Sequence, residues 1–458
     1  MYQEDTIAAV ATAVGEGGVA IIRISGPDAE RLATRVFERT SKSSCRLRSH
    51  MLYRGVIREP QSGQLLDQVL VVIMRGPRSY TGEDVVEIHC HGGVFLVRRI
   101  LGVVLAQGAR HAERGEFTKR AFLNGRIDLS QAEAVLDLIQ ARTDKSVDLA
   151  VQNVNGLLSR SVGALREELL DILVQIEAAI DFPDEEIELL QRPVLIQRID
   201  ALCEKIRVIL DSYAWGKLHR EGARVCICGR PNVGKSSLLN ALLGAERAIV
   251  SAVPGTTRDI IEDSLDLDGL PIVIWDTAGI RDTEEAVEKI GVGLTHDHIK
   301  KADMVVAVLD GSQSLTQDDV SMLTEINGAK SILAVNKSDL RQDINLQQTR
   351  HLVPEAMVLS VSAQNGDGID ALKTKLRQLL LGAAIESPTV LSNLRQKNSL
   401  SRGYDQLYIG MAALKDEKPP EIVAVNLHEA KQCLEEVIGI MTNEDILERI
   451  FSSFCIGK

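Results

Sequence analysis

Residues 223–240, ARVCICGRPNVGKSSLLN, contain the pattern that decides the fold of the central part of this chain. A short β-rich run leads into Gly-x-x-x-x-Gly-Lys-Ser over residues 229–236, and a helical pattern follows. Strand, loop and helix in this order are the context that a phosphate-binding loop requires. We expect backbone N–H groups of the loop to surround a β-phosphate. Lys235 then reaches the β- and γ-phosphates, and Ser236 offers its hydroxyl to Mg²⁺.

Two segments further along the chain indicate that the base is guanine. SILAVNKSD, residues 331–339, is an apolar strand that ends in Asn336, Lys337 and Asp339. A carboxylate at Asp339 accepts hydrogen bonds from both N1–H and the 2-amino group of guanine, which adenine cannot supply, so the site selects GTP over ATP. VLSVSAQNG, residues 358–366, places Ser362 and Ala363 where a loop backbone meets the guanine O6.

The switch segments differ from those of Ras-type enzymes. LPIVIWDTAG, residues 270–279, delivers Asp276 to hold Mg²⁺ through water and Gly279 to face the γ-phosphate. The next residue is Ile280, where a Ras-type enzyme has the glutamine that positions water. EEAVEKIG, residues 284–291, offers carboxylates, but the start of a solvated acidic helix explains the first two of them equally well.

Asn232 inside the phosphate loop has two open interpretations. Its amide oxygen lies beside the β- and γ-phosphates, where a monovalent cation can replace an arginine finger, with further oxygens from Ser251, Val253 and Thr256. An asparagine there can instead simply brace the loop. Thr257 is the switch hydroxyl expected on Mg²⁺. The GTP-binding set that we predict is Asn232, Val233, Gly234, Lys235, Ser236, Ser237, Ser251, Ala252, Val253, Pro254, Gly255, Thr256, Thr257, Asp276, Thr277, Ala278, Gly279, Asn336, Lys337, Asp339, Ser362 and Ala363.

Composition favours a cytosolic protein without membrane spans. The 458 residues are 45% hydrophobic and 25% charged, and the seven scattered cysteines fit a reducing compartment. No apolar run approaches the roughly 20 residues of a spanning helix, and no signal-peptide pattern opens the chain. Net charge is −12, yet residues 1–126 hold 18 Lys and Arg against 13 Asp and Glu. This basic third either meets an anionic ligand or RNA, or is a chance excess of arginine.

The flanking sequence predicts one helical domain, split by the nucleotide-binding domain inserted into it. Helical periodicity runs through 130–218, with a break at Pro183, and resumes after the insertion. We expect an α+β domain at 1–122, the two helical parts at 123–219 and 384–458, and an α/β Ras-like domain at 220–383. The trio His89, Cys90 and His91 suggests a metal site, but a strand sends its middle residue to the other face, which favours ordinary strand residues.

The whole chain resembles the bacterial and organellar tRNA modification GTPases, the TrmE/MnmE family. The resemblance rests on GGVAIIRISG, SYTGEDVVEIHCHGG, RGEFTKRAFLNGRIDL, DFPDEEIE, GRPNVGKSSLLN, GTTRD, DTAGIR and the terminal FCIGK. It implies hydrolysis of GTP to GDP and phosphate by a cytoplasmic homodimer joined through its N-terminal domains. It also implies action with an FAD-dependent flavoprotein, which adds a carboxymethylaminomethyl or aminomethyl group to C5 of the wobble uridine of certain tRNAs. A reduced folate, 5-formyl- or methylene-tetrahydrofolate, supplies the carbon.

The resemblance also implies roles for individual residues. Glu288 matches the glutamate that positions the attacking water. Ser236 and Thr257 match the Mg²⁺ ligands. The K⁺ ligands implied by the family are Asn232, Ser251, Val253 and Thr256. The folate contacts implied are Arg23, Glu87, Arg126 and Lys458, although position 126 is lysine in some relatives.

The tail FCIGK leaves its cysteine with two roles open. CIGK is a poor prenylation box, because glycine and lysine stand where an aliphatic and a small or apolar residue belong. The family's tail approaches the folate site, so Cys455 is either a reactive or positioning thiol there or a buried inert one. A rival function also stays open, namely an RNA-associated regulatory GTPase of the ribosome-assembly type without modification chemistry. A dynamin-like membrane GTPase is disfavoured, since no basic amphipathic face stands out.

Overall fold

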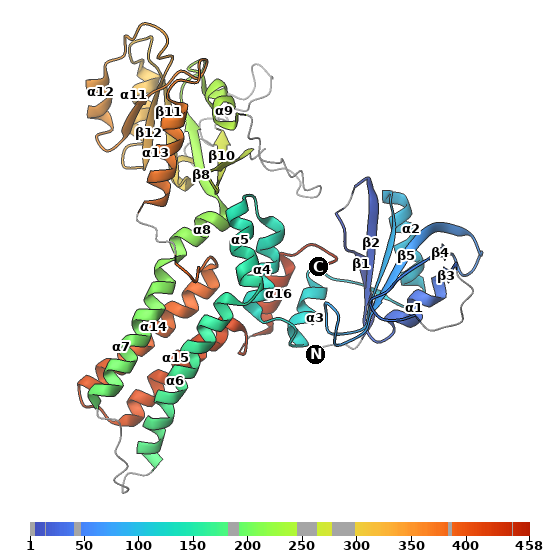
Figure 1. Cartoon of the computed structure of the whole chain (residues 1–458). Coiled ribbons are helices and arrows are strands. Elements are labelled where there is room, and N and C mark those ends of the chain that lie inside the picture. Colours follow the sequence, from blue (N-terminus) through green and yellow to red (C-terminus); the bar gives the residue numbers. More distant parts are fainter. Residues whose placement is uncertain are drawn as a thin grey trace. The chain divides into compact units, whose positions relative to one another are not determined.

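The computed structural model describes residues 5–13, 15–40, 47–181, 192–244, 263–276, 298–382, 387–441 and 443–458 (Figure 1). The chain forms two compact units. One comprises residues 1–136, 153–166 and 431–458, and the other comprises 137–152 and 167–430. An α+β region, a set of helices and an α/β domain follow one another along the chain, and helices resume after the α/β domain. The predicted fold class is therefore confirmed, while the exact domain boundaries stay a prediction.

The first unit is built on a seven-stranded sheet. Its strand order is β3-β4-β5-β6-β2-β1-β7, with β7 parallel to β1 and every other pair antiparallel. The strands are β1 Ile7–Val10, β2 Gly17–Ser25, β3 Phe37–Arg39, β4 Leu52–Arg58, β5 Leu65–Met74, β6 Val85–Gly92 and β7 Arg110–His111.

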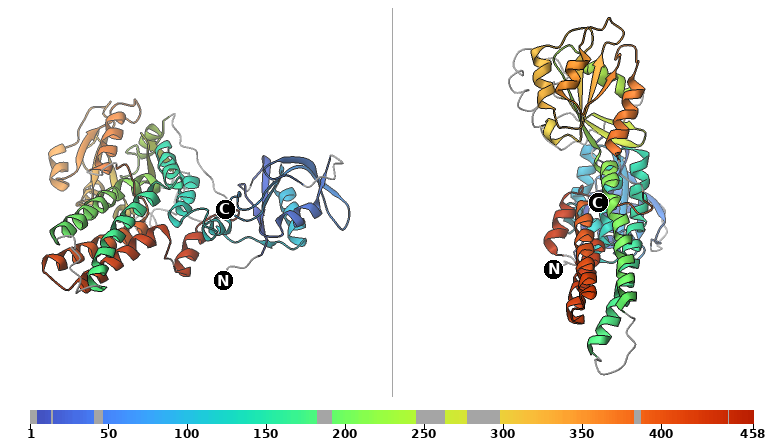
Figure 2. Two further views of the ribbon diagram at one scale, coloured as in Figure 1. Left: turned by 60° about the horizontal axis from the view of Figure 1, so that its bottom comes forward. Right: turned by 90° about the vertical axis from the view of Figure 1, so that its left-hand side faces the viewer.

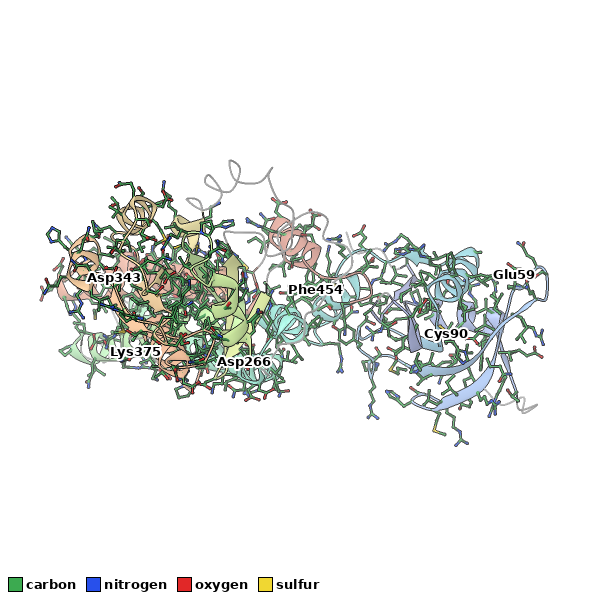
Figure 3. All side chains as sticks on the ribbon, turned by 90° about the horizontal axis from the view of Figure 1, so that it is seen from above. Glu59, Cys90, Asp266, Asp343, Lys375 and Phe454 are labelled. Atoms are coloured by element: carbon green, nitrogen blue, oxygen red, sulfur yellow. The ribbon has the colours of Figure 1, made fainter. Side chains whose placement is uncertain are left out.

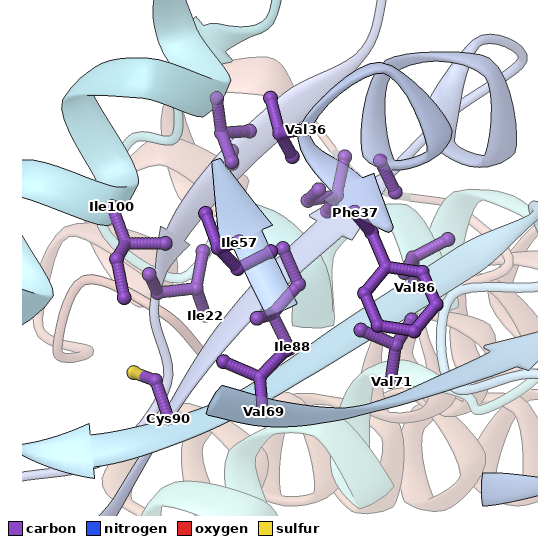
Figure 4. Packing of buried hydrophobic residues seen from close by; sticks show 14 of the residues in the cluster. Ile22, Val36, Phe37, Ile57, Val69, Val71, Val86, Ile88, Cys90 and Ile100 are labelled. Atoms are coloured by element: carbon purple, nitrogen blue, oxygen red, sulfur yellow. The ribbon is translucent and has the colours of Figure 1, made fainter. Parts of the chain in front are cut away.

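One face of this sheet forms the core with helices α1 (Ala29–Val36) and α2 (Val94–Ala106). Alternate residues of β2, β5 and β6 point inward, so that Ile22, Val71 and Ile88 are fully buried together (Figure 4). Cys90 belongs to the same buried set, and its side chain lies among these strands (Figure 3). The residues between them, including Arg23 and Glu87, therefore lie on the opposite face of the sheet.

Helices before and after the α/β domain pack together, as the split helical domain requires. Within the second unit, α7 packs along α14, and the His428 Nε2 lies 2.7 Å from Glu177 Oε1. Within the first unit, Arg166 Nε donates to Glu435 Oε1 at 2.9 Å. The helices are α3 Glu116–Leu123, α4 Leu129–Gln140, α5 Asp144–Val154, α6 Leu157–Asp181, α7 Arg192–Asp211, α8 Tyr213–Glu221, α14 Leu394–Lys415, α15 Pro420–Ile438 and α16 Glu444–Ser452. The predicted break at Pro183 lies outside the described residues.

The α/β domain has a six-stranded sheet of order β13-β12-β11-β8-β10-β9, in which only the β9–β10 pair is antiparallel. Helices cover both faces of the sheet (Figure 2). Strands β11 and β12 are buried along their whole length, as expected of parallel strands covered on both sides. The elements are β8 Ala223–Cys228, α9 Lys235–Leu243, β9 Asp263–Leu267, β10 Leu270–Asp276, β11 Met304–Asp310, α11 Gln317–Glu325, β12 Ser331–Asn336, α12 Leu346–Leu352, β13 Met357–Ser360 and α13 Ile369–Leu381.

The turn between β9 and β10 is bonded to the helices that precede the α/β domain. Thr143 Oγ1 donates to the carbonyl of Gly269 at 2.9 Å. Ser146 Oγ lies 2.8 Å from Thr143 Oγ1 and donates to the carbonyl of His219, in α8, at 2.6 Å. Both hydroxyl side chains are buried, so these bonds are shielded from competing water. The turn is thus fixed to helices α5 and α8.

Candidate functional site

The phosphate loop runs from the carboxyl end of β8 to the first turn of α9. Three of its residues have left-handed backbone conformations: Gly229 (φ 153°), Asn232 (φ 61°) and Gly234 (φ 97°). These turns aim successive N–H groups into one concavity at the positive end of α9, which is the geometry that binds a phosphate. A Cβ on Gly234 would collide with the side-chain amide of Asn336, so glycine is required for the close approach. Asn232, Ser236 and the neighbouring Ser237 are exposed at this loop.

The ammonium of Lys235 folds back over the phosphate loop. Its Nζ donates to the carbonyl oxygens of Gly229 and Arg230 at 2.8 and 2.9 Å. The side chain therefore already spans the mouth of the loop. Exchanging these two neutral carbonyl acceptors for negatively charged phosphate oxygens adds the attraction of an ion pair and so strengthens both hydrogen bonds.

The strand end of β12 is bonded directly to the phosphate loop. Asn336 is buried, and its Nδ2 donates to the carbonyl of Val233 at 2.9 Å. Its Oδ1 accepts from the N–H of Ala363, also at 2.9 Å. One amide thus joins the phosphate loop, β12 and the loop at residues 362–363. All three segments are predicted from the sequence to contact one nucleotide, and in the structure these hydrogen bonds join them.

The two other predicted residues of the NKSD segment, Lys337 and Asp339, also make side-chain hydrogen bonds. Lys337 Nζ donates to Asp310 Oδ2 at 2.6 Å. Burial of Asp310 opposes its ionisation, but hydrogen bonds from Lys337 and Ser312 outweigh this and lower the pKa of its carboxyl group. Asp339 is exposed, and one of its oxygens accepts from Ser362 Oγ at 2.6 Å. Its other oxygen has no hydrogen bond within the described part of the chain.

Replacing Asn336 by alanine is expected to weaken GTP binding at least tenfold and to lower the melting temperature. The change leaves the carbonyl of Val233 and the N–H of Ala363 without partners, at a cost of about 1–3 kcal/mol for each buried group. Titration with a fluorescent GTP analogue and thermal unfolding measure the two effects. Asn345→Ala is the matched control, because Asn345 only caps α12. Unchanged GTP affinity in Asn336→Ala would contradict the bridging role.

The switch residues of the predicted site lie outside the described residues, as does the side chain of Asp276. They are Ser251, Ala252, Val253, Pro254, Gly255, Thr256, Thr257, Thr277, Ala278, Gly279 and Glu288.

A second cluster of functional side chains lies on the face of the N-terminal sheet opposite the core. Arg23 on β2 stands directly across from Glu87 on β6, and two guanidinium nitrogens lie 2.9 Å from Glu87 Oε1. The guanidinium carbon of Arg23 also lies 5.1 Å from the ring centre of Tyr80 and 5.6 Å from that of Phe117. Arg23 is thus a fixed cation, held by one carboxylate and two aromatic rings.

The chain's tail is docked against this cluster. Arg23 Nη1 donates to the carbonyl of Gly457 at 3.4 Å, and the N–H of Phe117 donates to the carbonyl of Lys458 at 3.2 Å. Burial and the nearby Arg23 lower the pKa of the Lys458 ammonium, while Glu87 and Cys455 act in the opposite direction. The structure therefore brings Arg23, Glu87 and Lys458 together, although 434 residues separate Arg23 from Gly457.

The other two predicted members of this cluster are accessible. Cys455 is a free, exposed thiol, and its carbonyl accepts from the N–H of Gly115 at 3.4 Å. Of the two roles left open, a buried thiol does not fit this exposure, while a reactive or positioning thiol stays a prediction. Arg126 is exposed, and its side-chain Cγ lies close to Gly82, at the end of the loop that carries Tyr80.

Comparison with known proteins covers almost the whole chain. The family model described as "GTP-binding protein TrmE N-terminus" matches residues 6–126, and the "MnmE helical domain" model matches residues 129–455. The tRNA modification GTPase MnmE of Carboxydothermus hydrogenoformans is 45% identical over 99% of this chain and all of that protein. The protein of the same name from Geobacter sulfurreducens is 47% identical, with full coverage of both.

The chain belongs to the MnmE family of tRNA modification GTPases. The resemblance read from the sequence is thereby confirmed. Among solved structures, the G domain of the FeoB iron transporter of T. maritima is 27% identical over 34% of this chain and 98% of its own, with a TM-score of 0.27. That overlap adds nothing to the fold derived from the strand order.

The trio His89, Cys90 and His91 of this MnmE-family chain does not converge on a metal site. Cys90 is in the core, where burial, with a smaller effect of Asp67, raises the pKa of its thiol to about 11. His91 Nδ1 lies 2.7 Å from Asp67 Oδ1 on the other face. The described residues contain no group of three or more His, Cys, Asp and Glu side chains that could hold a metal ion.

Several residues of the two sites carried no chemical signal in the sequence. Tyr80 and Phe117 look like ordinary core residues, and only the three-dimensional register places them against Arg23. Arg120 is similar: it is buried, and its guanidinium contacts Asp5, Glu83 and Glu116, which fixes α3 where the tail docks. Only the spacing of Glu116 and Arg120, one helical turn apart, could have indicated this charge cluster from the sequence.

None of the described helices is long and apolar enough to cross a membrane.

Proposed function

We propose that this chain hydrolyses GTP in its α/β domain and uses that reaction in the modification of tRNA. The observation that carries the proposal is the bridge from Asn336 to Val233 and Ala363, because it assembles a phosphate loop and a guanine-reading loop at one place. The names of the family's relatives support the same activity. The protein works in the cytoplasm, with tRNA as its macromolecular substrate.

The modification that we propose adds a carboxymethylaminomethyl or aminomethyl group to C5 of the wobble uridine, at position 34 of the tRNA. A flavoprotein partner with FAD acts together with this chain, and a reduced folate donates the carbon. Arg23, Glu87, Arg126 and Lys458 hold the folate, with Cys455 next to it. The convergence of Arg23, Glu87 and the Gly457–Lys458 backbone supports this assignment.

The deciding experiment is analysis of tRNA nucleosides from cells that lack this protein. We expect the modified wobble uridine to disappear and to return when the gene is restored. Retention of the modified nucleoside at its normal level would refute the proposal. Binding of 5-formyltetrahydrofolate to the purified chain separately tests the folate site.

A homodimer through the N-terminal domains is also proposed. The face of the sheet opposite the core exposes large apolar side chains, including Leu52 on β4 (57% exposed) and Leu70 on β5 (42% exposed). A second copy of the chain would remove them from water. Light scattering of the full chain measures the mass directly, and a monomer across the micromolar range would contradict this assembly.

We expect K⁺ to raise the rate of GTP hydrolysis strongly, whereas Na⁺ leaves it low. Our proposal places Mg²⁺ on Ser236 and Thr257, and K⁺ on Asn232, Ser251, Val253 and Thr256. The cation then supplies the positive charge at the transition state that an arginine finger supplies elsewhere. Steady-state turnover in matched KCl and NaCl buffers measures the effect. Asn232→Ala should remove the difference between the salts, and equal rates in the unchanged protein would contradict the assignment.

A further inference from the structure

Strand β6 presents a row of three polar residues on the sheet face opposite the core: Glu87, His89 and His91. Ile88 and Cys90, which alternate with them, are buried on the core face (Figure 4). The two ends of the row are paired, Glu87 with Arg23 and His91 with Asp67. His89, in the middle, is not paired in this way.

The imidazole of His89 has an unmet hydrogen-bonding need. Its Nε2 is buried and has no hydrogen-bond partner in the described structure. The nearest carboxylate oxygen is Glu87 Oε2, at 3.5 Å, which is longer than an N–H···O hydrogen bond. A buried polar atom without a partner is unusual in a folded protein and requires an explanation.

Among the described residues, hydrogen bonds anchor only one carboxylate oxygen of Glu87. Both contacting nitrogens of Arg23, Nε and Nη2, lie 2.9 Å from the same oxygen, Oε1. The other oxygen, Oε2, faces His89. The terminal torsion of a glutamate is broad, so one anchored oxygen leaves the carboxylate plane free to rotate. A second anchor at Oε2 fixes that plane.

We propose that His89 is a positioning residue, which donates from Nε2 to Glu87 Oε2 and so fixes the Glu87 carboxylate for ligand binding. A shift of about 0.5 Å closes the contact to hydrogen-bond length. Arg23 then anchors Glu87 Oε1 and His89 anchors Oε2, which leaves the remaining lone pairs of the fixed carboxylate for the ligand. This inference rests on the proposed function, since the ligand is the reduced folate of that site. Its heteroaromatic ring offers the adjacent N–H donors that a fixed carboxylate accepts best.

The test is the binding of 5-formyltetrahydrofolate to the full-length protein, measured by calorimetry. We expect His89→Leu to weaken binding about tenfold, the usual worth of a hydrogen bond to a charged group. His89→Gln places an amide N–H within similar reach of Glu87 and should restore most of the affinity. His91→Ala is the matched control on the same row, and it should bind folate normally because His91 is paired with Asp67.

A double-mutant cycle distinguishes positioning from general damage to the sheet. In a Glu87→Ala background the acceptor is gone, so His89→Leu should cause little further loss. Additive losses, or a His89→Gln protein as weak as His89→Leu, would overturn the inference. So would a changed oligomeric mass of His89→Leu in light scattering. If the unchanged protein fails to bind the folate at all, the proposed function fails instead, and these outcomes are distinct.

Discussion

Replacing Gly457 by alanine is expected to abolish modification of the wobble uridine while GTP hydrolysis continues at its normal rate. Gly457 has a left-handed backbone (φ 98°), and a methyl group there would collide with the carbonyl of Val10. The collision displaces the Gly457 carbonyl from Arg23 and carries Lys458 away from the cluster. The phosphate loop lies far along the chain and keeps all of its own hydrogen bonds. Nucleoside analysis of tRNA and a phosphate-release assay measure the two activities.

Two further variants make the result interpretable. Gly163→Ala is the control for an added methyl group, because the site is helical and, apart from the adjacent backbone of its own helix, no described atom lies within 4 Å of the added carbon. It should leave both activities intact. Cys455→Ser keeps the tail docked and removes only the thiol, so loss of modification in that variant assigns chemistry to the sulfur. Normal modification by Gly457→Ala would show that the docking of the tail against Arg23 does not matter for the reaction.

Replacing Glu288 by alanine is expected to slow GTP hydrolysis by roughly 10²–10⁴, the usual contribution of a group that activates a nucleophile. Ile280 occupies the position of the Ras-type glutamine and cannot hydrogen-bond to water. A carboxylate must therefore orient the attacking water, and Glu288 is the residue we propose. GTP affinity should change little, because the water is not part of the bound nucleotide. Single-turnover hydrolysis and equilibrium titration separate these quantities.

Glu284→Ala is the matched control for the second prediction. It removes the same charge from the same acidic segment, at a position for which a solvated helix start is sufficient explanation. We expect its hydrolysis rate to stay near that of the unchanged protein. An equal loss of GTP affinity and of rate in Glu288→Ala would instead indicate a structural role for this carboxylate.

Local sequence patterns predicted the α/β domain well, because each nucleotide-binding segment is a strand end or a loop start. The parallel strands β8, β11 and β12 bring their carboxyl ends to one edge of the sheet, so the phosphate loop after β8 and Asn336 at the end of β12 lie at that edge. Short sequence patterns are therefore enough to predict which residues lie at this edge of the sheet. The helical periodicity likewise predicted the split helical domain.

The N-terminal site could not be derived in the same way. Arg23 and Glu87 are 64 residues apart, and they meet only because β2 and β6 pair antiparallel in one specific register. If either strand slipped by one residue, the side chain of that strand would turn into the core and the pair would be lost. The rings of Tyr80 and Phe117 and the tail reach Arg23 from other segments of the chain, so no short sequence pattern joins them. Resemblance to the family predicted the roles of Arg23 and Glu87, whereas local pattern did not.

The bonded turn between β9 and β10 has a thermodynamic consequence. In the sequence it separates the segment that contains Thr257, which we expect to bind Mg²⁺, from the segment that contains Gly279, which we expect to face the γ-phosphate. Thr143 bonds this turn to the helices. If GTP shifts the turn, it changes the helices' affinity for their partners by some factor. Linkage then requires those partners to change the affinity for GTP by that same factor. Binding of a partner to the helices would therefore change the occupancy of the nucleotide site, and binding of GTP would change the occupancy of the partner's site.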